Sequence, residues 1–63
     1  MDRKKFEAEM KKRGIKINKM CEILNMSRSA FYRKRNGISE FTLGEIQKIV
    51  EVLGLESPIG IFF

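Results

Sequence analysis

The chain has 63 residues, 43% of them hydrophobic, which fits one small folded domain over residues 1–63 with a thin buried core. Thirteen Lys and Arg against eight Asp and Glu leave a net charge of +5, a balance that favours a polyanionic partner. One Cys and no His exclude a disulfide framework, a Cys/His zinc site and His-based catalysis, so we expect no enzyme, metal or cofactor.

The first predicted helix covers about residues 2–13 and places Phe6 and Met10 on one inward face. Asp2 is its expected N-cap, because a carboxylate there can accept a hydrogen bond from an unpaired backbone N–H. Gly14 follows a Lys-Lys-Arg turn and suits the left-handed position that ends a helix. The charged N-terminal segment contains no secretory signal or membrane span, which predicts a cytoplasmic protein without a membrane partner.

The second predicted helix covers residues 17–24, with Ile17 and Asn18 both open as its first residue. Its apolar stripe consists of Met20, Cys21 and Leu24. Cys21 is therefore predicted to be a core side chain rather than a reactive thiol. Asn25 follows directly, and Asn tolerates the left-handed conformation that a sharp turn requires. We predict a turn at residues 25–27.

The third predicted helix covers residues 27–36, begins at the N-cap Ser27 and ends at Gly37. Ala30 and Phe31 are expected to pack inward. The outward positions carry polar and aromatic side chains that core packing does not require: Arg28, Ser29, Tyr32 and Arg33. A helix with such a face can enter the major groove of DNA, where Arg and Ser side chains reach base edges.

A loop at residues 38–41 precedes a fourth predicted helix over residues 42–53. Thr42 and Glu45 have the spacing of a capping box, and Gly54 is the expected terminal residue. The inward stripe repeats every three or four positions: Leu43, Ile46, Ile49, Val50 and Leu53. A Ser-Pro pair then predicts a short helical turn over residues 58–62.

Together these segments resemble the phage repressor and Cro type of helix-turn-helix protein over nearly the whole chain. The resemblance rests on the turn at residues 24–29, Phe31, the pair Asn36-Gly37, and the helix from Ile46 to Leu53 followed by Gly54-Leu55. The last three residues also resemble the ending of several phage-encoded members. The resemblance implies a compact all-α, lambda-repressor-like domain of four to five helices.

The same resemblance implies a sequence-specific regulator of transcription that binds double-stranded DNA, most simply a phage or prophage repressor reading a palindromic operator. Base contacts are then expected at the start of the third helix and one turn later, from Ser27, Arg28, Ser29, Tyr32 and Arg33. Phosphate contacts are expected from Lys16, Asn18, Lys19, Lys34, Arg35 and Asn36.

Four positions depart from the family pattern. Asn25 replaces the turn Gly and Cys21 replaces a small Ala, and both replacements are tolerable. The other two departures bear on DNA contact. Ile17 occupies a position that is often a phosphate-binding Gln, so Lys16 or Asn18 would replace that contact. Lys34 occupies a position that is a large apolar residue in many relatives. Its stem either crosses the edge of the core or directs the ammonium group to the DNA backbone.

The C-terminal segment is unusually apolar, with Leu55, Ile59, Ile61, Phe62 and Phe63 within its last nine residues. Three interpretations remain open: packing on the chain's own core, contact with a second copy in a homodimer, or insertion into a membrane surface. An alternative function also follows, a protein-interaction module of antitoxin-like or anti-regulator type that uses this tail. No small-molecule substrate is expected.

Overall fold

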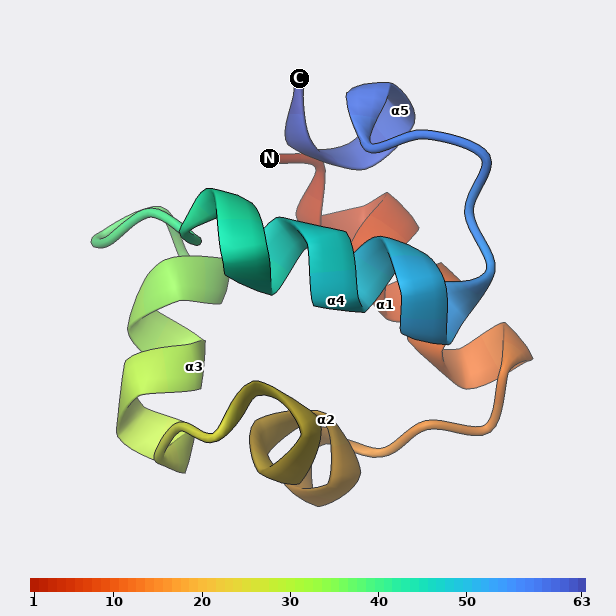
Figure 1. Ribbon diagram of the computed structural model, residues 1–63. Helices are drawn as coiled ribbons and strands as arrows, with labels where there is room; N and C mark the ends of the chain where they lie inside the picture. Colours follow the sequence, from red (N-terminus) through yellow and green to blue (C-terminus); the bar gives the residue numbers. More distant parts are fainter.

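The computed structural model describes residues 1–63 and contains five helices and no strand. The helices are α1 (Arg3–Lys12), α2 (Ile17–Leu24), α3 (Arg28–Arg35), α4 (Leu43–Leu53) and α5 (Ile59–Phe62). In Figure 1, α2 is seen nearly end-on beside an upright α3, while α4 runs across the view in front of α1. The predicted all-α fold is confirmed, and the predicted helix ends differ from the observed ones only at capping residues.

Side-chain caps explain where three of the helices begin. Asp2 and Ser27 each accept a hydrogen bond at 3.1 Å from the backbone N–H three residues further on. Thr42 and Glu45 form the complete capping box that their spacing predicted. Helix α2 begins at Ile17 and has no side-chain cap. Its first backbone N–H groups are therefore left for solvent or a ligand.

The sharp turn between α2 and α3 depends on Asn25. This residue has φ 53° and ψ 51°, the left-handed conformation that the sequence predicted. The N–H of Met26 then donates to the carbonyl of Cys21 at 3.1 Å, which satisfies a carbonyl in the last turn of α2. Because the chain reverses within three residues, α3 starts directly beside the end of α2.

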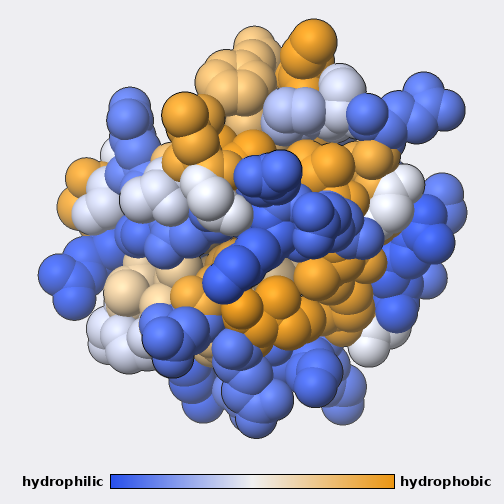
Figure 2. Space-filling view, viewed as in Figure 1, coloured by the Kyte–Doolittle hydropathy of each residue, from blue (hydrophilic) through white to orange (hydrophobic).

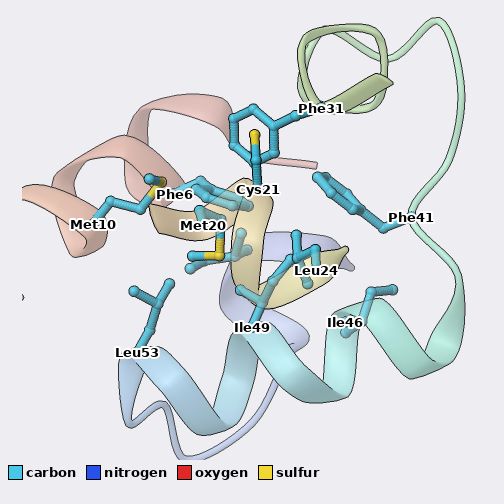
Figure 3. Packing of buried hydrophobic residues seen from close by; sticks show 11 residues of the cluster. Phe6, Met10, Met20, Cys21, Leu24, Phe31, Phe41, Ile46, Ile49 and Leu53 are labelled. Atoms are coloured by element: carbon cyan, nitrogen blue, oxygen red, sulfur yellow. The ribbon is translucent and has the colours of Figure 1, made fainter. Parts of the chain in front are cut away.

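The core is formed by eleven buried residues, all of them hydrophobic: Phe6, Met10, Met20, Cys21, Leu24, Phe31, Phe41, Ile46, Ile49, Leu53 and Ile61. Figure 3 shows most of this cluster enclosed between the helices. The ring of Phe6 lies at its centre, with its centroid 6.0 Å from each of Phe31, Phe41 and Phe62. Aromatic contacts therefore join α1, α3, α5 and the loop before α4.

One predicted position is wrong, and one core residue was not predicted. Leu43 was assigned to the inward stripe of the fourth helix, but it is 79% exposed. It is the first residue of α4, and the core side chain at this end of the helix is Ile46, one turn later. Phe41 lies in the predicted loop, and its ring, which the sequence did not assign to the core, is buried and stacks on Phe6 with a 23° angle between the planes.

The C-terminal segment packs mainly on its own domain. Ile61 is buried, and the ring of Phe62 contacts Phe6 and Phe41 edge-on. The N–H of Asp2 donates to the carbonyl of Ile61 at 2.6 Å, so both ends of the chain lie together, as Figure 1 shows. Ile61 therefore follows the first of the three interpretations left open for the tail, packing on the chain's own core, which leaves little of its side chain for a possible dimer contact.

Candidate nucleic-acid interface

Helix α3 is attached to the core by a single buried side chain, that of Phe31. The residues on its outward side remain exposed: Ser27, Arg28, Ser29 and Arg33. This outward side of α3 is therefore available to a ligand, while the opposite side packs on the domain.

Arg28 is oriented by its neighbour one turn along the helix. Its Nη2 donates to the phenolic Oη of Tyr32 at 3.4 Å, and this hydrogen bond raises the pKa of Arg28. The Tyr32 ring is half-buried, with the Cζ of Arg35 4.9 Å from its centroid on one side and an edge-to-face contact with Phe31. These contacts hold the Tyr32 ring in place. Its exposed hydroxyl accepts the hydrogen bond that orients the Arg28 guanidinium.

Arg33 lies along the exposed face of α3. Its Nε donates to the backbone carbonyl of Ser29 at a long distance of 3.5 Å. A guanidinium carries five N–H donors in a planar fork, so its two terminal nitrogens remain free for a pair of acceptors. This geometry suits recognition of one guanine edge.

The start of α2 lies beside the start of α3. A hollow of about 490 Å³ between α1, the start of α2 and α3 has a charged and polar lining that consists of Glu7, Lys11, Lys16, Asn18, Arg28 and Arg35. The uncapped first turn of α2 adds unpaired N–H groups and the positive end of the helix dipole, and both attract anions. Three predicted phosphate contacts, Lys16, Asn18 and Arg35, thus line one hollow with the predicted base contact Arg28.

Lys11 was missed by the sequence analysis. It stands in the last turn of α1 and reaches the same hollow because that turn leads directly to the start of α2. The Lys-Lys-Arg run before Gly14 was the available signal, but it was assigned to solvent. Lys19 is exposed, with a long 3.8 Å contact to Glu22.

Lys34 makes an ion pair within the chain instead of pointing freely to solvent. Its Nζ lies 2.6 Å from Oε1 of Glu45, and only 18% and 20% of the two side chains is exposed. Partial burial by itself raises the pKa of Glu45, but hydrogen bonds from Lys34 and from the Thr42 backbone, with the Lys34 charge, leave it below its ordinary value. The sequence left two orientations open for Lys34, and the structure shows the stem crossing the edge of the core.

The next two residues are also held within the chain. Nη1 of Arg35 lies 3.2 Å from Oε1 of Glu7, and Nη1 of Arg3 donates to Oδ1 of Asn36 at 3.0 Å. Arg35 and Asn36 were predicted phosphate contacts together with Lys34. All three side chains therefore have partners in α1 or α4.

A comparison with protein families identifies the chain. The model described as the Cro/C1-type HTH DNA-binding domain matches residues 5–58, which include α2, its turn and α3 in full. The chain belongs to the Cro/C1-type helix-turn-helix family. No curated protein and no solved structure matches it significantly. The family match confirms the resemblance noted in the sequence and supports a DNA-binding regulator.

Three further features of this Cro/C1-type domain are its single cysteine, its possible metal ligands and the length of its helices. Cys21 is buried as predicted, and desolvation raises the pKa of its thiol although the nearby Arg28 charge acts in the opposite direction. No group of three or more His, Cys, Asp or Glu side chains is placed to hold a metal ion. None of the helices combines the length and the apolar character that crossing a bilayer requires.

Proposed function

We propose that this Cro/C1-type domain is a sequence-specific transcriptional regulator of the phage or prophage repressor kind, which inserts α3 into the major groove of a palindromic operator. The observation that carries the proposal is the outward polar face of α3, on which Ser27, Arg28, Ser29 and Arg33 are exposed beside the half-buried Tyr32. Guanidinium groups there can bind guanine bidentately, and hydroxyl groups can either donate a hydrogen bond to a base edge or accept one from it.

Phosphate binding is proposed at the hollow between α1, α2 and α3. Lys16 and Asn18 line it with Lys11, and Lys19 extends the positive surface along α2. Neutralising phosphates releases counterions, so log affinity falls linearly with log salt concentration. For about five or six phosphates per subunit the expected slope is about −5, whereas a slope near zero would contradict DNA binding by this surface.

A second copy of the chain is the proposed occupant of an apolar groove of about 520 Å³. Phe41, Ile46 and Phe62 line the groove, and the exposed side chains of Leu43 and Phe63 stand on it. Figure 2 shows hydrophobic side chains exposed at the top of the molecule, over the C-terminal end. Projecting side chains beside an apolar groove permit a two-fold contact in which each copy fills the groove of the other.

The position of the groove also favours a second copy over an unrelated partner. Lys34 and Gly37, at the end of α3, belong to its lining. A second copy seated there would lie next to the end of α3, and a palindromic operator requires two recognition helices held by one dimer. Of the tail residues assigned to dimer contact, Phe62 and Phe63 line the groove, Leu55 is half-buried against the core, and Ile59 is exposed elsewhere.

The dimer surface can be tested with a matched pair of variants. Leu43→Arg and Ile59→Arg each place a charge at an exposed apolar site, 79% and 68% exposed, but only Leu43 lines the groove. Sedimentation equilibrium is expected to show a dimer for wild type and Ile59→Arg, and a monomer for Leu43→Arg. Equal behaviour of both variants contradicts this surface.

The central experiment is selection of bound duplexes from a random pool. The expected result is a two-fold symmetric sequence with half-site centres about 34 Å apart, one turn of DNA. Failure to enrich any sequence contradicts the proposal. The exposed groove favours one alternative, a protein-interaction module with the same fold, and this module is indicated if random duplex also fails to bind at low salt.

A further inference from the structure

The last residues of the recognition helix are bound to the rest of the domain by three separate contacts. Lys34 pairs with Glu45 of α4, while Arg35 and the cap residue Asn36 are bound by side chains of α1. The Lys34 contact has the shortest distance, 2.6 Å, and both of its side chains are mostly covered. The end of α3 is therefore tied to helices on two sides.

These contacts matter because α3 has little else to set its direction. Its start is held by the Asn25 turn and the Ser27 cap, and its middle by Phe31. A short helix that packs through Phe31 and the half-buried Tyr32 retains freedom to change its angle, since the burial of apolar surface is non-directional. Contacts at its far end remove this freedom.

We propose that Lys34 and Glu45 are positioning residues for DNA recognition, which fix the angle of α3 and do not themselves touch DNA. The inference rests on the proposed function, because it concerns how α3 reads its operator. It replaces the expectation that Lys34 binds a phosphate.

Three observations favour a positioning role over a phosphate contact. Glu45 Oε1 accepts from both Lys34 Nζ and the Thr42 N–H, so the carboxylate is fixed at the first turn of α4. Lys34 lines the apolar groove beside Phe41, not the hollow formed by the start of α2. Transfer of Lys34 to a phosphate would also leave a partly buried carboxylate without its cation, which is costly.

The decisive variant is Glu45→Gln. Gln can still complete the capping box, so α4 retains its start, but the charge pair with Lys34 is lost. The substitution also raises the net charge of the protein, and electrostatics alone predicts tighter binding to every DNA. A positioning role predicts weaker binding to the selected operator half-site, because the outward side chains of α3 no longer align with the base edges.

The measured quantity is the ratio of affinities for one operator half-site and a random duplex, which keeps dimer formation out of the comparison. We expect Glu45→Gln and Lys34→Met each to lower this ratio about tenfold and to leave the salt slope unchanged. The double variant is expected to lower the ratio no further than either single variant, because both substitutions remove the same ion pair. Lys48→Met, an exposed cation of α4, is the control that removes one charge without touching the pair and leaves the ratio unchanged. Thermal unfolding verifies that each variant is folded.

Two results overturn the inference. In one, both variants keep the wild-type ratio, so the pair has no influence on reading. In the other, Lys34→Met weakens operator and random DNA equally and reduces the slope by about 1, which identifies a phosphate contact. If the wild-type protein binds every duplex equally, the proposed function itself is contradicted. This outcome is seen without any variant and therefore differs from the two above.

Discussion

The ring of Phe6 in α1 meets the ring of Phe31 in α3 edge-on, with centroids 6.0 Å apart and planes inclined at 75°. Both side chains are completely buried. Phe31 is the only buried residue of α3, so this contact attaches the recognition helix to the core. Edge-to-face geometry of this kind adds to the free energy of burial.

Replacement of Phe31 with Ala should unfold the domain. Removal of a buried Phe side chain costs about 3–5 kcal/mol, as much as the whole stability expected of a domain this small. Urea unfolding followed by circular dichroism measures the effect, with Ile59→Ala as the matched control at a site that is 68% exposed. The control is expected to stay within about 0.5 kcal/mol of wild type. A cooperative transition of wild-type midpoint in Phe31→Ala would show that α3 is attached in another way.

The turn residue Asn25 provides a test of backbone strain. At φ 53° a Cβ-bearing residue without a local hydrogen-bonding side chain is strained, so Asn25→Ala should cost about 1–2 kcal/mol. Asn25→Gly adopts the same conformation without this penalty and should remain close to wild type. Chemical denaturation of both variants measures the difference, and equal losses would mean that the Asn side chain, rather than the left-handed backbone, stabilises the turn.

The elements were largely predictable because their signals are local. A cap, a 3.6-residue apolar period and a left-handed terminal residue lie within one segment, and the start of α3 at Ser27 and the box at Thr42 and Glu45 needed no tertiary information. The family match over residues 5–58 agrees with the pattern of the helix-turn-helix. The exposed Arg28 and Arg33 follow from the same local pattern.

Errors arose where distant segments meet. Phe41 lies outside any helix, so no periodicity could assign its ring to the stack on Phe6. Leu43 has the correct period but stands where α4 extends beyond the core. The partners of Lys34 and Arg35 lie in other helices, and a sequence pattern cannot distinguish a cation paired across helices from one that is free to bind phosphate.

Stability should depend on pH through Glu45. Its pKa is lower in the folded chain than the ordinary glutamate value of about 4.3. The ionised carboxylate therefore stabilises the fold fully above that value, and this contribution is lost as the pH falls through the lower folded pKa. Urea unfolding should find Glu45→Gln about 1–2 kcal/mol less stable than wild type at pH 7, and the difference should shrink as the pH falls through the lowered folded pKa of Glu45. Glu51→Gln, on the exposed face of α4, is the control, and its stability should stay close to wild type at every pH. If the stability lost in Glu45→Gln does not depend on pH, the charge of Glu45 is not its cause.

Base reading should depend on the planar fork of Arg33. Loss of a bidentate guanine contact costs about 1–3 kcal/mol, so Arg33→Ala should bind the selected operator about tenfold to a hundredfold more weakly and relax the preference at one base pair. Arg33→Lys keeps the charge but not the fork, and should therefore lose the same preference while its salt slope stays unchanged. Fluorescence anisotropy on the operator and on its single-base variants measures both quantities, with Lys12→Ala in α1 as a control cation outside α3. If Arg33→Ala instead loses the same affinity on every duplex and its slope falls by about 1, Arg33 binds a phosphate and the base is read by another side chain of α3.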